Sequence, residues 1–241
     1  DEMSQSFNFA WLVSPWSAAA FADVVTGTFE ALAEVGATPT WVLSNHDVIR
    51  HATRYGGGTR GLARARAATL TMLALPGSSY LYQGEELGLE QVDVEPRFRQ
   101  DPSWFRTGEV GRDGCRVPIP WSGEAPPFGF GPGSGQPWLP QPADWAGLTA
   151  AAQEDDEHST LAFYRRALRA RRGLTGTSID LLDLGADVLA FRRDGVVAVL
   201  NCGTTPVDLA AAGLAGEVLI ASGEHPVDGA LAPDTAVWLR A

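Results

Sequence analysis

The order in which hydrophobic patterns change along this 241-residue chain is the feature that most restricts its fold. In the first part, short apolar runs alternate with longer stretches whose apolar residues recur at helical spacing, which is typical of βα units around a parallel sheet. The expected elements are strand 7–13, helix 17–36, strand 40–44, helix 59–75, strand 79–82 and helix 159–172. Ser17 and Ser159 stand where helix N-caps are expected, and Pro76-Gly77 ends the middle helix.

From Ile179 onward the pattern changes to short strands separated by turns. The predicted strands are 179–184, 188–193, 196–202, 207–209, 217–221 and 237–239. Asp194-Gly195 lies between two of them, and this dipeptide is typical of a two-residue hairpin turn. The sequence therefore predicts two domains, an α/β domain over residues 1–175 and a small antiparallel β domain over residues 176–241.

A long stretch over residues 90–145 shows little periodicity and is rich in Pro, Gly and Trp. Loops of this length are usually functional or disordered, and the tryptophans embedded in it favour an ordered, functional loop. In the helix that follows, the apolar stripe expected to be buried consists of Leu161, Tyr164 and Leu168. The arginines of this helix, Arg171 among them, are expected mostly to face solvent.

Charge and cysteine content exclude several classes of function. The formal net charge of −11 opposes nucleic-acid binding, which depends on neutralising phosphates with basic side chains. No apolar run approaches the roughly 20 residues needed to cross a bilayer, so no membrane association is expected. All eighteen basic residues are Arg, which suggests a GC-rich bacterial source. Cys115 and Cys202 lack zinc-site spacing, and we expect free thiols in a reducing cytoplasm.

Asn45-His46-Asp47 follows directly after the predicted strand 40–44. The carboxyl ends of parallel strands form the functional edge of α/β folds, because the loops that leave them converge. A histidine beside a carboxylate can hold hydroxyl groups and stabilise positive charge in a transition state. Taken alone, the tripeptide also fits a turn in which Asn and Asp cap backbone groups.

Three blocks of sequence, in order, resemble one family. The segment from Asn45 to Gly56 resembles the fourth signature region of the α-amylase family, family thirteen of the glycoside hydrolases, in its α-glucosidase and oligo-1,6-glucosidase branch. The segments 73–88 and 111–121 resemble the following helix, strand and active-site loop of that branch. The resemblance implies the C-terminal part of a (β/α)8 TIM barrel, its last three βα units, followed by a small antiparallel β-sandwich domain.

The resemblance also implies roles for single residues. Asp47 corresponds to the carboxylate that stabilises the transition state, and His46 to a residue that hydrogen-bonds the same glucosyl unit. Arg112 or Arg116 is expected to contact the non-reducing end of the sugar, and the sequence does not separate the two. The implied substrate is a small oligosaccharide, of the maltose type or sucrose, and no cofactor is implied.

The retaining mechanism of this family needs a nucleophilic Asp and a general-acid Glu about 5 Å apart. In the family they lie in earlier motifs, the pattern GFRxD and a Glu that ends the following strand, and neither occurs in this sequence. We therefore expect this chain to be part of a retaining α-glucosidase whose missing N-terminal half is its partner. The alternatives are a glucosyltransferase or sucrose isomerase of the same fold, and a non-catalytic carbohydrate-binding remnant.

Other chemistry-bearing patterns are expected to be structural. Glu85 and Glu86 are expected to brace the loop after the predicted strand 79–82. His46 and His51 lack the HExxH spacing of a metal site, so no metal is expected here. The glycine-rich segment 129–135 lacks the strand, helix and lysine of a phosphate-binding loop, and no GxSxG motif indicates a serine hydrolase.

Overall fold

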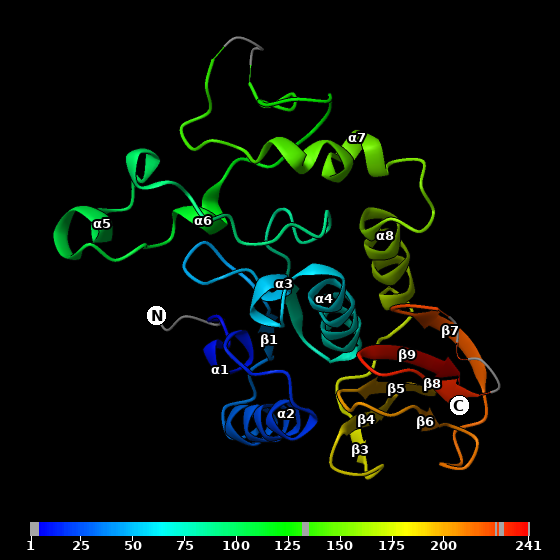
Figure 1. Cartoon of the computed structure of the whole chain (residues 1–241). Helices are drawn as coiled ribbons and strands as arrows, with labels where there is room; N and C mark the ends of the chain where they lie inside the picture. Colours follow the sequence, from blue (N-terminus) through cyan, green and yellow to red (C-terminus); the bar gives the residue numbers. More distant parts are fainter. Residues whose placement is uncertain (1–4, 132–134, 225, 227–228, 241) are drawn as a thin grey trace.

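A computed structural model describes residues 5–131, 135–224, 226 and 229–240 of the chain. Figure 1 shows α1 to α4 with β1 in the centre of the view, the segment carrying α5 to α7 above them, and a β-sheet below α8. No helix of these residues is long and apolar enough to cross a membrane. The structure thus has an α/β part, an extended loop region and a β part.

The α/β part contains the predicted helices and two parallel strands. Its elements are α2 (Ala18–Ala33), β1 (Thr40–Val42), α3 (His51–Arg54), α4 (Gly58–Ala74) and β2 (Ser78–Tyr80). Ser17 caps α2 as predicted, since its side chain accepts a hydrogen bond from the Ala20 amide. β1 and β2 pair in parallel with Thr40 opposite Ser78. α2, β1, α4 and β2 match the predicted elements to within a few residues at each end, whereas the four-residue helix α3 was not predicted.

The predicted strand over residues 7–13 is wrong. Residues 9–12 form a short helix, α1 (Phe9–Leu12), which buries Trp11 and Leu12. The side chain of Asn8 accepts a hydrogen bond from the Trp11 amide at 3.0 Å, so it acts as a helix N-cap. The described residues therefore contain two parallel strands instead of the three expected, because a local cap outweighs the apolar run.

The long region after β2 is ordered around its own hydrophobic cluster. Its short helices are η1 (Pro96–Phe98), α5 (Pro102–Thr107), α6 (Asp113–Arg116), η2 (Ala143–Leu148) and α7 (Ala150–Gln153). The cluster consists of Leu87, Leu89, Val94, Val117, Ile119, Phe128, Leu139 and Trp145. The prediction of an ordered loop is confirmed for the described residues; residues 132–134 of the glycine-rich segment lie outside them.

Helix α8 (Thr160–Arg171) begins at the predicted cap, because the Ser159 hydroxyl accepts a hydrogen bond from the Ala162 amide. Its buried residues are Thr160, Phe163, Tyr164 and Ala167. Leu168 is 39% exposed, so its predicted place in the buried stripe is wrong. The prediction for Arg171 is also wrong, since its guanidinium lies against backbone carbonyls at the end of α4. Both errors arise because the elements that cover a helix face are not local in sequence.

The C-terminal part is an antiparallel sheet with a small ribbon. The five-stranded sheet has the order β3 (Asp180–Leu182), β4 (Val188–Arg193), β5 (Val196–Asn201), β9 (Thr235–Arg240) and β7 (Glu217–Ala221). β6 (Val207–Asp208), which the sequence predicted, pairs with β8 (Ala230–Leu231), which it did not. The predicted hairpin is confirmed, because Asp194 and Gly195 connect β4 to β5 with φ of 51° and 74°.

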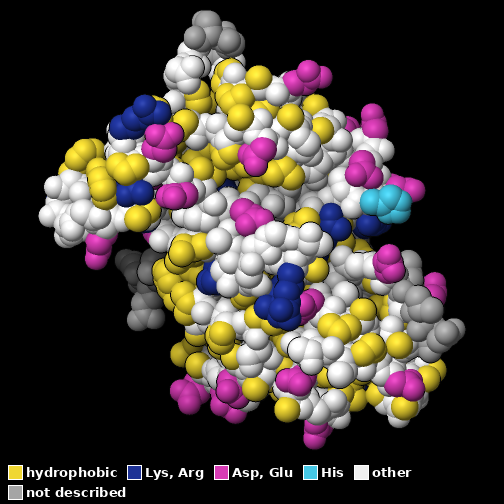
Figure 2. All heavy atoms as spheres, in the orientation of Figure 1, with side chains coloured by type: hydrophobic (Ala, Val, Ile, Leu, Met, Phe, Trp, Pro, Cys, Tyr) yellow, Lys and Arg dark blue, Asp and Glu magenta, His cyan; other side chains and the backbone are white. Residues whose placement is uncertain are grey.

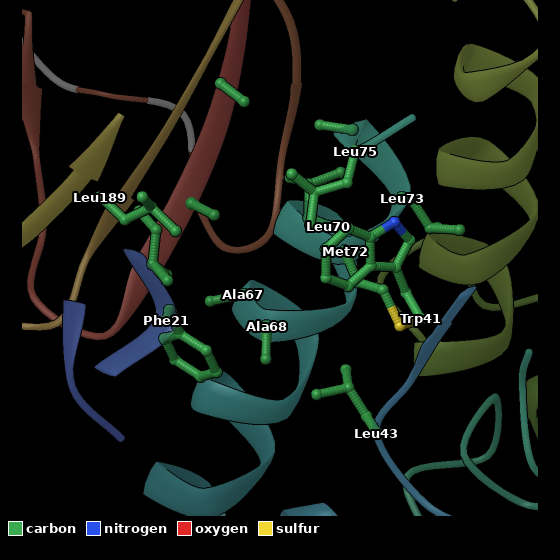
Figure 3. Packing of buried hydrophobic residues seen from close by; sticks show 14 of the residues in the cluster. Phe21, Trp41, Leu43, Ala67, Ala68, Leu70, Met72, Leu73, Leu75 and Leu189 are labelled. Atoms are coloured by element: carbon green, nitrogen blue, oxygen red, sulfur yellow. The ribbon is translucent and has the colours of Figure 1, made fainter. Parts of the chain in front are cut away.

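The sheet packs one face on helix α4, so the α/β and β parts share a hydrophobic core. Figure 3 shows Phe21 of α2, Trp41 and Leu43 of the β1 region, several residues of α4 and Leu189 of β4 in one cluster. The indole of Trp238 on β9 donates a hydrogen bond to the Leu70 carbonyl of α4 at 3.2 Å. The opposite face of the sheet packs on the β6–β8 ribbon. The predicted boundary at residue 175 falls between α8 and β3.

Candidate active site

The tripeptide Asn45-His46-Asp47 leaves the carboxyl end of β1, as predicted. Asn45 is buried, and its side-chain oxygen accepts hydrogen bonds from the amides of Asp47 at 2.8 Å and Val48 at 3.1 Å. This Asx-type turn fixes the backbone of Asp47 and leaves its side chain partly exposed. The turn and the site are therefore compatible interpretations of the same residues, since the turn presents the carboxylate.

Asp47 is surrounded by three groups that can carry positive charge. Arg112 Nη1 donates a hydrogen bond to Asp47 Oδ1 at 2.8 Å, and Arg116 Nη2 lies 3.3 Å from the same oxygen. Nε2 of His46 lies 3.3 Å from Asp47 Oδ2. The structure thus brings together all four site residues that the sequence indicated, including both candidate arginines. It joins segments that are 65 and more residues apart in the chain.

The surroundings of Asp47 keep its carboxylate ionised. The hydrogen bond from Arg112 holds the pKa of Asp47 below its ordinary value, against the opposing effect of partial desolvation. The charges of His46, Arg112 and Arg116 lower this pKa further. Because 40% of the side chain is exposed, a ligand can reach the carboxylate. The site therefore presents a fixed negative charge to solvent.

Asp101, which the sequence did not single out, orients Arg112. Asp101 Oδ2 accepts hydrogen bonds from Arg112 Nε at 2.7 Å and from the Arg112 amide at 3.1 Å. Its other oxygen accepts one from the Ser103 amide, and these hydrogen bonds hold the pKa of Asp101 well below its usual range. Asp101-Pro102 could have been recognised as a helix cap, but nothing in the sequence links it to Arg112.

Arg116 contacts the backbone of the tripeptide as well as its carboxylate. Its Nε donates a hydrogen bond to the His46 carbonyl at 2.8 Å. The guanidinium therefore spans the peptide that joins His46 to Asp47, and it is half as exposed as that of Arg112, 21% against 41%. Arg112 and Arg116 begin and end the region of α6, so one short helix supplies both guanidinium groups.

Glu85 and Glu86 brace the turn after β2, which confirms the prediction for them. Glu85 Oε1 accepts a hydrogen bond from the Tyr82 amide, and Glu86 Oε2 accepts one from the Gly84 amide. Burial raises the pKa of Glu85 to about 8 and lowers that of His51 to about 3. At neutral pH both groups are therefore uncharged, and their 3.9 Å approach is no ion pair. His51 hydrogen-bonds Ser44 through Nδ1.

The described residues contain no metal-ligand cluster, and the face shown in Figure 2 carries no broad basic surface. Among the described residues, no group of three or more His, Cys, Asp and Glu side chains is placed to hold a metal ion. Figure 2 shows acidic side chains scattered over the face in view and basic side chains in small separate groups. Neither Cys115 nor Cys202 forms a disulfide. What the described site can do is bind and polarise a ligand through one carboxylate, two guanidinium groups and an imidazole.

The fold and the site together define a class of protein with an α/β framework whose strand ends present a carboxylate held by arginine. Such a carboxylate is suited to a hydroxyl-rich ligand. The sequence profile described as "Alpha amylase, catalytic domain" matches residues 2–176. The chain belongs to the α-amylase family, family thirteen of the glycoside hydrolases, which confirms the resemblance found in the sequence.

Several known proteins are similar to this chain. A "Probable alpha-glucosidase" of Rhizobium meliloti is 37% identical over 159 residues, covering 64% of this chain and 28% of that protein. An oligo-1,6-glucosidase of Saccharomyces cerevisiae is 27% identical over 239 residues, covering 81% of this chain and 41% of that protein. The crystal structure of an α-glucosyl transfer enzyme has a TM-score of 0.79 and 34% identity, covering 99% of this chain and 47% of that one.

A trehalulose synthase from Pseudomonas mesoacidophila shares the fold at a TM-score of 0.77 and 24% identity, covering 96% of this chain and 48% of that one. The chain spans less than half the length of all these relatives. It thus corresponds to part of the family's catalytic domain and the antiparallel sheet that follows it.

Proposed function

We propose that this chain is part of a retaining α-glucosidase that hydrolyses terminal α-linked glucose from short oligosaccharides. The observation that carries the proposal is the exposed carboxylate of Asp47, held ionised by Arg112 at the carboxyl end of β1. Such a charge stabilises the positive charge that develops on the sugar ring in an oxocarbenium-like transition state. Similarity to glucosidases from a bacterium and a yeast supports this assignment.

The two arginines suggest different roles. Arg112 is fixed by Asp101 through Nε and by Asp47 through Nη1, which leaves Nη2 and the second proton of Nη1 for a sugar hydroxyl. Arg116 holds the His46 carbonyl and is the less exposed of the two. Arg112 therefore hydrogen-bonds the non-reducing end of the glucosyl unit, while Arg116 holds the loop that carries His46 and Asp47.

The proposed partner is the remainder of the same catalytic domain, with its nucleophile and general acid. Residues 1–175 then supply the last part of a (β/α)8 barrel, and residues 176–241 a small antiparallel domain. Within the described residues β1 pairs with β2 alone, so its other edge is free for a further strand. Beside it lies an open groove of about 690 Å³, whose apolar lining includes Phe7, Val24, Leu32 and the 73%-exposed Val35. Closing the barrel covers this surface.

A second candidate function is glucosyl transfer or sucrose isomerisation on the same site. The similarity to an α-glucosyl transfer enzyme, at 34% identity over nearly the whole chain, favours this candidate. Hydrolysis and these two reactions use the same glucosyl subsite and differ in whether water or a sugar attacks the intermediate. A non-catalytic carbohydrate-binding protein is the third candidate, and it requires only the binding residues.

One experiment separates the three candidates. The enzyme that contains this chain is incubated with maltose, sucrose and an aryl α-glucoside, and the products are followed by proton NMR. A retaining glucosidase releases glucose first as the α-anomer, whereas a transferase or isomerase forms a new disaccharide. Sugar binding without turnover identifies the binding protein, and initial release of β-glucose contradicts the retaining mechanism.

A further inference from the structure

Arg50 lies behind the candidate site, and its side chain connects three separate segments of the chain. It follows the site tripeptide at the start of α3 and is 2% exposed. Its Nη1 donates a hydrogen bond to the Gln83 carbonyl after β2 at 2.9 Å. Its Nη2 donates to the Cys115 carbonyl in α6 at 3.0 Å. One guanidinium thus joins the loops after β1 and β2 to the helix that carries Arg112 and Arg116.

The chemistry of this contact is unusual for a buried charge. Buried guanidinium groups are usually paired with carboxylates, because an unpaired charge is costly to desolvate. No carboxylate of the described residues lies within 4 Å of Arg50, whose partners are carbonyls and the Tyr82 ring, 4.9 Å below it. The Tyr82 hydroxyl also donates to the Cys115 carbonyl, at 3.0 Å. The same carbonyl therefore receives two side-chain donors.

The turn after β2 leaves space for the guanidinium at Gly84. A Cβ at this position would lie 2.9 Å from Arg50 Nη1 and 2.8 Å from the Leu89 side chain. The φ of Gly84 is +90°, a backbone conformation that residues other than glycine rarely adopt. The backbone of the turn is thus shaped around the arginine, which indicates a fixed position for its guanidinium.

From these contacts we propose that Arg50 is a positioning residue: it fixes the Cys115 carbonyl and thereby holds Arg112 and Arg116 against Asp47. Cys115 lies between the two arginines in a helix of only four residues, so its carbonyl is the available backbone anchor. This inference rests on the proposed function only in what the arginines bind. The hydrogen bond from Arg50 to the Cys115 carbonyl concerns only the orientation of α6, so it can be tested apart from catalysis.

Arg54 provides a matched control for Arg50. Its guanidinium also lies over a tyrosine ring, that of Tyr55, at 5.1 Å, and also donates to two backbone carbonyls. Those carbonyls belong to Ile49 and Leu43, on either side of the tripeptide Asn45-His46-Asp47 and not in α6. Arg50→Met and Arg54→Met therefore remove equivalent contacts, but only the first releases α6. Arg50→Lys, which keeps the charge and one donor direction, serves as the milder variant if Arg50→Met does not fold.

The test measures amide hydrogen exchange by mass spectrometry in the enzyme that contains this chain, together with kcat and KM on an aryl α-glucoside. We expect Arg50→Met to speed exchange in residues 112–117 about tenfold, with a smaller effect in Arg50→Lys and none in Arg54→Met. We expect kcat/KM to fall about 100-fold in Arg50→Met, because small misplacements of binding groups are costly. The displacement of Arg112 should raise KM, and that of Arg116 should lower kcat.

The two readouts separate the inference from the proposed function. If the enzyme shows no activity on α-glucosides, the proposed function fails, while exchange in residues 112–117 still decides the role of Arg50. If activity is present but exchange in residues 112–117 is as slow in Arg50→Met, or in Arg50→Lys where Arg50→Met does not fold, as in Arg54→Met, and the KM stays at the wild-type value, Arg50 does not position α6 and the inference is overturned.

Discussion

Nη1 of Arg112 donates a 2.8 Å hydrogen bond to Oδ1 of Asp47, and this contact joins residues from two loops that are far apart in sequence. The same guanidinium is held from behind by the buried carboxylate of Asp101 at 2.7 Å. Arg112 therefore links a buried carboxylate to an exposed one. The link gives the exposed carboxylate a defined position before any ligand arrives, which is the requirement for electrostatic stabilisation of a transition state.

Removing this contact should change the titration of Asp47. In Arg112→Ala, we expect the pKa of Asp47 to rise toward its ordinary value of 3.8, because its strongest hydrogen bond is lost. A depressed pKa stabilises the fold fully above the ordinary value, and that contribution is lost as pH falls through the folded-state pKa. Carboxyl-carbon NMR titration measures the shift. Arg116→Ala, which removes a longer contact, is expected to raise the pKa less.

The same pair of variants separates the roles of the arginines. We expect Arg112→Ala to raise the KM for maltose about 10- to 100-fold, since a hydrogen bond to a charged group contributes about 1.5–3 kcal/mol. We expect Arg116→Ala to act mainly on kcat, because it holds the loop of Asp47. The reverse pattern in steady-state kinetics would assign sugar binding to Arg116.

Glu85 makes the fold progressively less stable as pH rises from its free pKa of 4.5 to about 8. Its pKa is about 8 in the folded protein against 4.5 when free, so between these values the folded state holds a proton that the unfolded state has lost. Unfolding then releases a proton, and stability falls by about 1.4 kcal/mol for each pH unit. We expect Glu85→Gln to gain stability over the wild type between pH 5 and 8 in urea unfolding.

Glu86→Gln is the control for this prediction, since Glu86 braces the same turn but is partly exposed. Over the same pH range, the stability gained by Glu85→Gln should exceed that gained by Glu86→Gln. A stability difference between Glu85→Gln and the wild type that does not change with pH would show that Glu85 is already ionised in the folded protein at neutral pH.

Arg171 hydrogen-bonds the backbone carbonyls at the end of helix α4, from which it is separated by about one hundred residues of sequence. Its guanidinium donates to the carbonyls of Leu73 and Leu75, which a helix end leaves unpaired, and to that of Gly77 in the turn before β2. We expect Arg171→Met to lower the free energy of unfolding by about 1–3 kcal/mol, the cost of leaving a buried polar group unsatisfied. Arg172→Met, on the exposed side, should be close to neutral, and equal losses in the two variants would contradict this role.

Local sequence signals predicted much of the fold. The caps of α2 and α8 and the Asp194-Gly195 hairpin follow from side chains and dihedral preferences within a few residues, and all three are present. The failures share another cause. The apolar run over residues 7–13 was predicted as a strand, but the Asn8 cap makes residues 9–12 a helix. Leu168 was predicted to be buried but is exposed, because the elements covering α8 are distant in sequence.

The candidate site shows the same limit. The tripeptide could be located because its position after a strand is a local property, and Arg112 and Arg116 because their motif resembles a family segment. Asp101 lies outside the resembling segments, and Arg50 lies inside one without any signal of its role, since their partners are 11 and 65 residues away and two of the contacts are to backbone carbonyls. Sequence alone identified the residues proposed to face the ligand more readily than the residues that hold them in place.

The most direct test of the account is the turnover of Asp47→Asn in the enzyme that contains this chain. Asp93→Asn is the matched control, because the Asp93 side chain, in the long region after β2, is 94% exposed and pairs with Arg99, which is not an arginine of the site. We predict that kcat on an aryl α-glucoside falls about 10²- to 10³-fold in Asp47→Asn and stays at the wild-type value in Asp93→Asn. The urea unfolding midpoint of Asp47→Asn at pH 7 should fall only slightly, because the charged hydrogen bond to Arg112 is lost while the core is untouched. A kcat for Asp47→Asn equal to that of Asp93→Asn would remove Asp47 from the active site.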